Sequence, residues 1–258
     1  MKDDQARDTW SVDAGASLQS VLDDPECPPL LHQALTGVLS WQTRNETPVH
    51  KALMAPRVTS QWVAALLALG ATATVEGEAG PSVLPLHAFL QRRTAGEVSA
   101  LHIPLPPSLP PVSEGDVREG WGEAHVARTP TDEPIVAAFA IVEMDGSTVR
   151  QARLALTGVW PEPARLAEAP ARLAGGPLDE TSIRAVAEAV EQEVTPRGDF
   201  RGSAGYRRAM AGVVTRRALE AAWRQGEGRE GREGKEGKQE AGGRMQDVGC
   251  RGQGARDE

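Results

Sequence analysis

The stretch IVAAFAIVEMDGSTVRQARLALTGV, residues 135–159, decides the fold class. Two apolar runs rich in β-branched residues, Ile135–Glu143 and Val149–Val159, flank the tetrapeptide MDGS at 144–147. An Asp-Gly pair between apolar runs is typical of a tight β-hairpin turn, because glycine accepts the positive φ that such turns need. We therefore expect an antiparallel strand pair here.

Two amphipathic helices are expected after this hairpin. One begins at Leu178–Thr181 and ends before Pro196, and the other covers residues 206–218. In both segments apolar residues recur three or four positions apart, which gives each helix a single apolar face. A strand pair followed by helices predicts an α+β unit.

The N-terminal part also mixes helices and strands. Short helices are expected from Ser17 to Leu22 and from Pro28 or Pro29 onward, because serine caps a helix and proline is tolerated in its first turn. Ser60 is a plausible cap for the apolar helix Gln61–Leu69, and the strand-like run Ala71–Val75 follows directly.

Shifts in composition divide the chain into four segments. Prolines occupy five of the positions 104–111 and bias the backbone to extended conformations, so 106–114 is interpreted as a linker between units at 9–105 and 115–224. Residues 225–258 are rich in glycine and charge and poor in apolar side chains. We expect this tail to be disordered, because it cannot bury enough surface to offset its ordering entropy.

Charge and motif content exclude several classes of function. The 28 basic and 36 acidic residues give a formal net charge of -8, which argues against nucleic-acid binding. The chain has two cysteines without a CxxC spacing, no apolar run of membrane-spanning length and no apolar leader, so a cytoplasmic protein is expected. The five histidines lack ligand spacing, and no nucleophile elbow or Walker loop occurs. We predict no metal site and no catalytic residue.

Several sequence patches resemble one family in their order along the chain. They are SVDAGASLQSVL (11–22), QTRNET (42–47), AALLALGA (64–71), GEVSALHIPLP (96–106), ARLALTGVWPEPAR (152–165), GPLD (176–179) and DFRGSAGYRR (199–208). The family is the flavin-binding medium subunit of molybdenum hydroxylases of the xanthine dehydrogenase and carbon monoxide dehydrogenase type. The resemblance covers about residues 9–222.

The resemblance implies a cofactor, partners and a fold. Medium subunits bind FAD and pass electrons from iron-sulfur clusters of a small subunit to an acceptor, while a large molybdenum subunit oxidises the substrate. The implied fold is a truncated FAD-binding PCMH-like domain at 9–105 and a CO dehydrogenase flavoprotein C-terminal-like domain at 115–224. The implied activity is that of a non-autonomous oxidoreductase subunit. A flavin-less structural or assembly subunit, or a degenerate fragment, is the alternative, and the substrate and electron acceptor stay open.

The cofactor site implied by the resemblance is altered. The family holds the FAD diphosphate with two glycine-rich loops, because glycine lets backbone N–H groups approach the phosphates. The first loop belongs to a subdomain that is expected to be absent, since only Met1–Asp8 precede the match. At the second loop, the segment Pro48–Ala52 stands where the family has Thr, Ile or Leu, Gly, Gly and Asn.

The candidate cofactor-binding residues are Val49, His50, Lys51 and Val98. Lys51 and His50 could replace lost backbone contacts to phosphate, while Val49 and Val98 keep apolar character, with Val98 expected against the flavin ring. Solvated side chains for Lys51 and His50, and ordinary core positions for the two valines, are the plain alternatives. We predict that the chain binds FAD poorly or not at all alone.

Two residues differ from the family pattern, and a cluster of basic residues allows two interpretations. Gln61 stands where the family has Asp, and His125 stands where a Lys often reaches the flavin. A basic cluster lies on or beside the last helix and is expected either to pair with Glu191, Glu193 or Glu220 or to dock a partner subunit. Its members are Arg201, Arg207, Arg208, Arg216 and Arg217.

Overall fold

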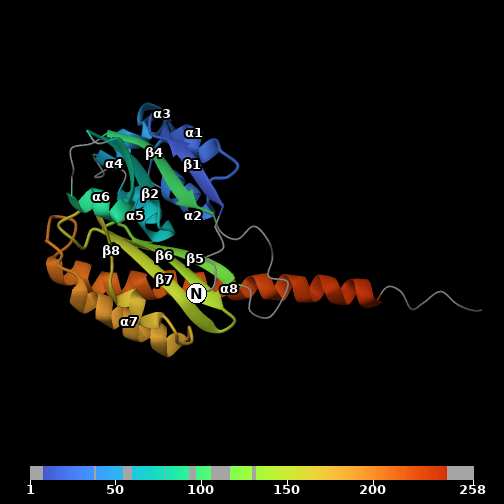
Figure 1. Ribbon diagram of the computed structural model, residues 1–258. Helices are drawn as coiled ribbons and strands as arrows, with labels where there is room; N and C mark the ends of the chain where they lie inside the picture. Colours follow the sequence, from blue (N-terminus) through green and yellow to red (C-terminus); the bar gives the residue numbers. More distant parts are fainter. Residues whose placement is uncertain are drawn as a thin grey trace, which may run out of the picture. The chain divides into compact units, whose positions relative to one another are not determined.

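Two antiparallel sheets and the helices between and beside them make up the computed structural model (Figure 1). The model describes residues 8–37, 39–54, 60–78, 80–92, 97–105, 117–129 and 132–242, with side chains described up to Gly226 except that of Arg92. Tertiary contacts divide the chain after Gly226, and the first unit holds both sheets. The predicted linker at 106–114 lies outside the described residues.

The first sheet has the strand order β1-β4-β2-β3. Its strands are β1 (Thr9–Asp13), β2 (Thr72–Gly77), β3 (Gly80–Pro85) and β4 (Glu97–Pro104). The helices of this part are α1 (Leu18–Asp23), α2 (Pro29–Thr36), α3 (Trp41–Glu46), α4 (Val49–Met54), α5 (Ser60–Leu69) and α6 (Leu86–Arg92). The expected cap of the first helix is confirmed, because the Ser17 hydroxyl accepts a hydrogen bond from the Ser20 backbone N–H at 3.1 Å.

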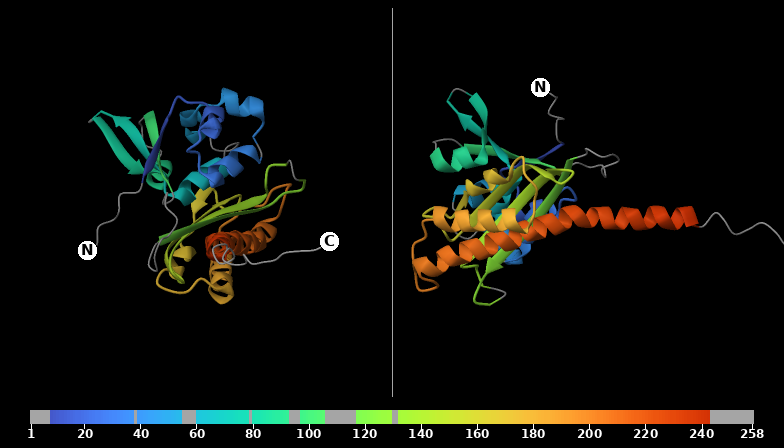
Figure 2. Two further views of the ribbon diagram at one scale, coloured as in Figure 1. Left: turned by 90° about the vertical axis from the view of Figure 1, so that its right-hand side faces the viewer. Right: turned by 90° about the horizontal axis from the view of Figure 1, so that it is seen from below.

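The second sheet has the order β5-β6-β7-β8 and lies between two helical layers. Its strands are β5 (Val117–Val126), β6 (Val136–Asp145), β7 (Thr148–Thr157) and β8 (Ala164–Leu166); the one-turn helix η1 (Ala169–Leu173), α7 (Glu180–Glu193) and α8 (Ala204–Gly242) follow. Helix α5 contacts β6, β7 and β8 on one face, and α7 and α8 cover the other (Figure 2). The predicted α+β class is confirmed, and the expected hairpin joins β6 to β7 through Gly146 at φ 58°.

Two glycines on β5 let helix α8 approach the sheet closely. A Cβ at Gly120 would overlap the carbonyl oxygen of Ala222, and one at Gly122 would overlap that of Ala218. The side-chain oxygen of Gln225 also accepts the Trp121 backbone N–H at 2.6 Å, on the outer edge of the sheet. The helix therefore covers both the face and the edge of β5, which protects an otherwise open strand.

Arg207 on α8 ties the helix to the second sheet. Its side chain is buried, and its guanidinium donates to the carbonyls of Ile135 and Gly158, each at 2.8 Å. A second nitrogen donates to both carboxylate oxygens of Asp199 at 2.8 Å. The hydrogen bond from Arg207 is the main reason why the pKa of Asp199 lies below its ordinary value.

One member of the basic cluster follows the predicted pairing, because Arg216 lies 3.7 Å from Glu220. Arg201 pairs instead with Glu133 at 2.9 Å, and Arg207 pairs inside the fold with Asp199 at 2.8 Å, so neither has a predicted partner. Docking of a partner through Arg207 is therefore excluded, because its guanidinium is buried under protein atoms.

The disorder expected for residues 225–258 stays a prediction, although helix α8 extends into this segment. The helix continues to Gly242, while 243–258 lie outside the described residues. Extending an existing helix fixes one residue per hydrogen bond, so it costs less than starting a new one, and no proline interrupts 225–242.

We predict that Gly122→Ala lowers the free energy of unfolding by about 1–3 kcal/mol, because the added methyl forces the strand and helix apart. Gly205→Ala is the matched control, since a Cβ there meets nothing within 4 Å and alanine favours a helix. Urea denaturation measures both variants. Equal stability of Gly122→Ala and the parent chain would contradict the close packing of α8.

Arg207→Met is expected to lower the free energy of unfolding by about 1–3 kcal/mol, because the buried carbonyls of Ile135 and Gly158 lose their donor. The neighbouring residue Arg208 is exposed. Arg208→Met should therefore stay within about 0.5 kcal/mol of the parent. The same urea titration gives both values, and similar losses in the two variants would argue against a special role for Arg207.

Candidate functional site

The segment expected to hold phosphate runs beside the loop that follows β1. Val49 begins helix α4, and its backbone N–H donates to the carbonyl of Ala16 at 2.9 Å. The backbone N–H of His50 donates to the carbonyl of Ala14 at 2.9 Å, and its ring Nδ1 lies 2.8 Å from the same oxygen. Both backbone donors are thus already used inside the protein.

These residues do not fit an FAD diphosphate. A phosphate cradle needs several free backbone N–H groups pointing at one place. Pro48 has no N–H, and those of Val49 and His50 are directed at carbonyl oxygens. The side chain of Val49 is fully buried, whereas Lys51 is exposed.

The structure does bring His50 and Val98 together, at an open pocket of about 630 Å³. The pocket is lined by His50, Met54, Glu76, Gly77, Glu78, Glu97 and Val98. Three carboxylates in one pocket create a negative potential that opposes a phosphate group. Val98 itself lies on β4 and is 4% exposed, as expected for a core position. Val49 and Lys51 do not line this pocket.

Gln61 and His125, the two residues that differ from the family pattern, do not line this pocket. Gln61 is 8% exposed in α5. His125 on β5 hydrogen-bonds through Nδ1 to Glu123 at 2.6 Å, and the amide of Gln33 on α2 donates to the second oxygen of Glu123 at 2.7 Å. The hydrogen bond to Glu123 raises the pKa of His125. Glu123 thereby links α2 to β5.

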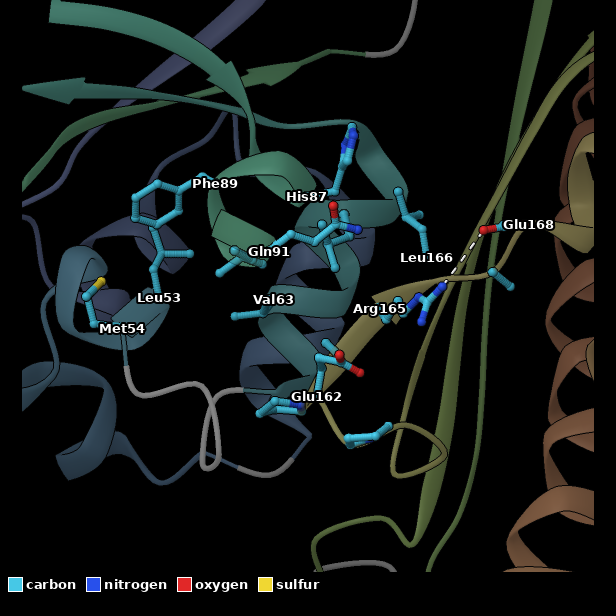
Figure 3. A pocket seen from close by; sticks show the side chains of 16 residues that line it. Leu53, Met54, Val63, His87, Phe89, Gln91, Glu162, Arg165, Leu166 and Glu168 are labelled. Carbon is cyan, nitrogen blue, oxygen red and sulfur yellow. Dashed lines mark ion pairs between the residues drawn. The ribbon is translucent and has the colours of Figure 1, made fainter. Parts of the chain in front are cut away.

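A larger cavity, which the sequence did not predict, lies against the edge strand β8 (Figure 3). It has a volume of about 970 Å³ and is bounded by helices α4, α5 and α6 and by residues 161–168. Its apolar lining includes Leu53, Met54, Val63, Leu67, Phe89, Leu90 and Leu166. Figure 3 shows Leu53, Met54 and Phe89 on one side and Arg165 and Glu168 on the other.

The polar residues of this cavity come mainly from the strip 161–168. Arg165 lies 3.8 Å from the Glu168 carboxylate and stacks over the ring of Trp160 at 4.8 Å. Glu162 adds a second carboxylate to the lining. The only sequence signal for this region is the patch at 152–165, which marks the family and not a cavity.

Within the described ranges, no group of three or more His, Cys, Asp or Glu side chains is placed to hold a metal ion. None of the helices in that part of the chain is long and apolar enough to cross a membrane.

Residues 124–222 match the family model of the CO dehydrogenase flavoprotein C-terminal domain. The carbon monoxide dehydrogenase medium chain of Hydrogenophaga pseudoflava is 27% identical over 195 residues, which are 76% of this chain and 67% of that relative. The glyceraldehyde dehydrogenase medium chain of Sulfolobus acidocaldarius is 23% identical, over 74% of this chain and 67% of the relative. The match thus spans about two thirds of each relative's length.

Solved structures share the same fold. A carbon monoxide dehydrogenase structure from Hydrogenophaga pseudoflava matches with a TM-score of 0.73 and 26% identity, over 84% of this chain and 76% of that one. Quinoline 2-oxidoreductase from Pseudomonas putida 86 matches with a TM-score of 0.70 and 26% identity, over 85% and 76% of the two chains. Both matches extend over more than four fifths of this chain. The comparisons thus support a similarity to the medium subunits of the xanthine dehydrogenase and carbon monoxide dehydrogenase type.

Proposed function

We propose that the chain is the medium subunit of a molybdenum hydroxylase, a cytoplasmic oxidoreductase complex. Its partners are a large molybdenum-binding subunit and a small iron-sulfur subunit, and the complex passes electrons from substrate to an acceptor. The observation that carries this proposal is the flavoprotein C-terminal domain at 124–222 on a fold shared with carbon monoxide dehydrogenase.

In this proposal the isolated chain does not hold FAD. The backbone donors of Val49 and His50 are engaged, and three glutamates face the pocket beside them. An electron-transfer role through FAD therefore requires phosphate-binding groups from another chain of the complex. The cofactor supplies the redox chemistry when it is bound, and this chain supplies part of the surface around it.

A flavin-less structural subunit is the second candidate function. The same engaged donors favour it, because they leave no free backbone N–H of Val49 or His50 for FAD while the fold shared with the medium chains is retained. The two candidates differ in one observable: the complex contains FAD in the first and lacks it in the second.

We expect the purified chain alone to show no saturable FAD binding. If the chain is an electron-transferring medium subunit, flavin absorbance should appear once the large and small subunits are co-expressed with it. Absorbance spectra and a fluorescence titration with FAD measure both states. A stoichiometric flavin in the isolated chain would contradict the poor fit of the Pro48–Ala52 segment. A complete complex without flavin would select the structural subunit.

A glycine variant tests the cause of the poor fit. Pro48→Thr, His50→Gly and Lys51→Gly together restore the threonine and both glycines of the family loop. We expect this variant to remain without FAD when alone, because the carboxylates of Glu76, Glu78 and Glu97 still face the pocket. Gln42→Gly with Thr43→Gly in the equally short helix α3 controls for helix destabilisation, which is about 1 kcal/mol per glycine. Tight FAD binding by the triple variant would show that the loop side chains alone exclude the cofactor.

A further inference from the structure

The tight turn at residues 199–202, called the Phe200 turn below, is held by hydrogen bonds on every side. Asp199 and Gly202 pair through their backbones, with N–H to carbonyl distances of 3.0 and 3.3 Å. One carboxylate oxygen of Asp199 also accepts the backbone N–H groups of Arg201 at 2.9 Å and of Gly202 at 3.1 Å. The buried Arg207 holds both oxygens of that carboxylate. Because paired, charge-assisted bonds of this kind fix geometry, the turn has one ordered shape.

Phe200 projects from this turn into solvent, with 85% of its surface exposed. Arg128 donates to the Phe200 carbonyl at 2.7 Å, and its guanidinium lies 5.6 Å from the centroid of the Phe200 ring. A cation over one face of the ring favours a defined ring position. Tyr206 is 40% exposed and lies against the same turn, since a Cβ at Gly202 would be 3.0 Å from its Cδ1 atom. Two exposed aromatic side chains therefore share one ordered support.

An aromatic ring that is exposed and held in place has the properties of a binding anchor. Folding gains nothing from a ring that stays in water, whereas burial against a partner removes its apolar surface from water. Because the backbone of the Phe200 turn is already ordered, docking through Phe200 costs little additional conformational entropy. Aromatic residues and arginine are also enriched in the cores of protein interfaces.

The charges around the Phe200 turn are mainly positive. The contacts of the turn and of Arg207 join the segments 128–135, 157–159 and 197–208. These segments contain five arginines and three carboxylates, namely Arg128, Arg197, Arg201, Arg207, Arg208, Asp132, Glu133 and Asp199, although the whole chain has a net charge of -8. Glu133 and Asp199 pair with Arg201 and Arg207. Arg128 pairs with no carboxylate in the described part of the chain, so a negative partner surface is complementary.

We propose that the Phe200 turn docks onto another subunit of the complex, with Phe200 inserted into an apolar pocket that has carboxylates at its rim. This inference rests on the proposed function, because the complex supplies the partner. Phe200 provides the apolar anchor, and Arg128 provides the charge that faces the acidic rim. Arg207 stays buried and holds the turn in shape.

The test uses the tagged full chain, co-expressed with a large and a small subunit of the molybdenum hydroxylase type. The amounts of both subunits that stay bound during serial dilution give the affinity of the complex. We expect Phe200→Ser to weaken the complex about tenfold or more, as truncation of an interface anchor does. Phe200→Leu keeps an apolar side chain and should stay within about threefold of the parent.

Matched variants separate docking from general effects. Trp41→Ser removes another exposed aromatic side chain, 68% exposed on α3, and should leave the affinity unchanged. Arg128→Gln should weaken the complex about threefold at low salt and lower its salt dependence, because a rim charge acts through screened electrostatics. Arg217→Gln, which changes an exposed arginine further along α8, is its control. Equal urea midpoints of Phe200→Ser and the parent show that the fold is intact, and the exposed Arg128 gives a second test if they differ.

Several results would overturn the inference. Phe200→Ser that assembles with the affinity of the parent would remove the docking role and leave the proposed function standing. A parent chain that forms no complex would overturn both.

Two other occupants of the Phe200 turn are distinguished by the chain alone. In sedimentation velocity, a dimer that Phe200→Ser abolishes would assign the turn to a second copy of this chain. Binding of the parent, but not of Phe200→Ser, to vesicles of phosphatidylserine and phosphatidylcholine would assign it to a membrane surface. Either result, together with unchanged assembly of Phe200→Ser, would replace the proposed partner.

Discussion

Strand β6 imposes the central constraint on this fold, because it is buried on both faces. Every residue from Val136 to Met144 has little or no contact with solvent, so the sheet needs a helical layer on each side. Helix α5 supplies one layer, and α7 with α8 supplies the other. Phe139 joins the core that contains α5, whereas Ala138 and Ala140 join the core that contains α8. The two parts of the chain are therefore coupled through one strand.

This coupling also creates the candidate sites. Helix α5 is buried along its whole length between the two sheets, and its residues Val63 and Leu67 line the larger cavity beside β8. The segment that matches the family's phosphate loop instead starts helix α4. The backbone N–H groups of Val49 and His50 donate there to the carbonyl oxygens of Ala16 and Ala14. The scaffold of the medium subunits is thus retained here with altered chemistry at one predicted site.

Local sequence signals predicted the elements that depend on local physics. The Asp-Gly turn, the Ser17 cap and the apolar face of α7 were all predicted from the sequence, because each depends on neighbouring residues. Strand β5 was not predicted, since Gly120 and Gly122 weaken a strand pattern and gain their meaning only from contact with α8.

The buried role of Arg207 and the larger cavity could not be predicted from local sequence signals either. Arg207 looked like a surface residue on a charged helix, and its buried role depends on carbonyls far away in the sequence. The larger cavity likewise joins residues from four separate segments.

The central claim is that this chain works inside a complex of the molybdenum hydroxylase type. Native mass spectrometry of material purified through a tag on this chain, after co-expression with a large and a small subunit of the molybdenum hydroxylase type, tests the claim most directly. The account predicts one complex that contains all three chains in fixed stoichiometry. Recovery of this chain alone, with the other two folded and present in the lysate, would contradict it.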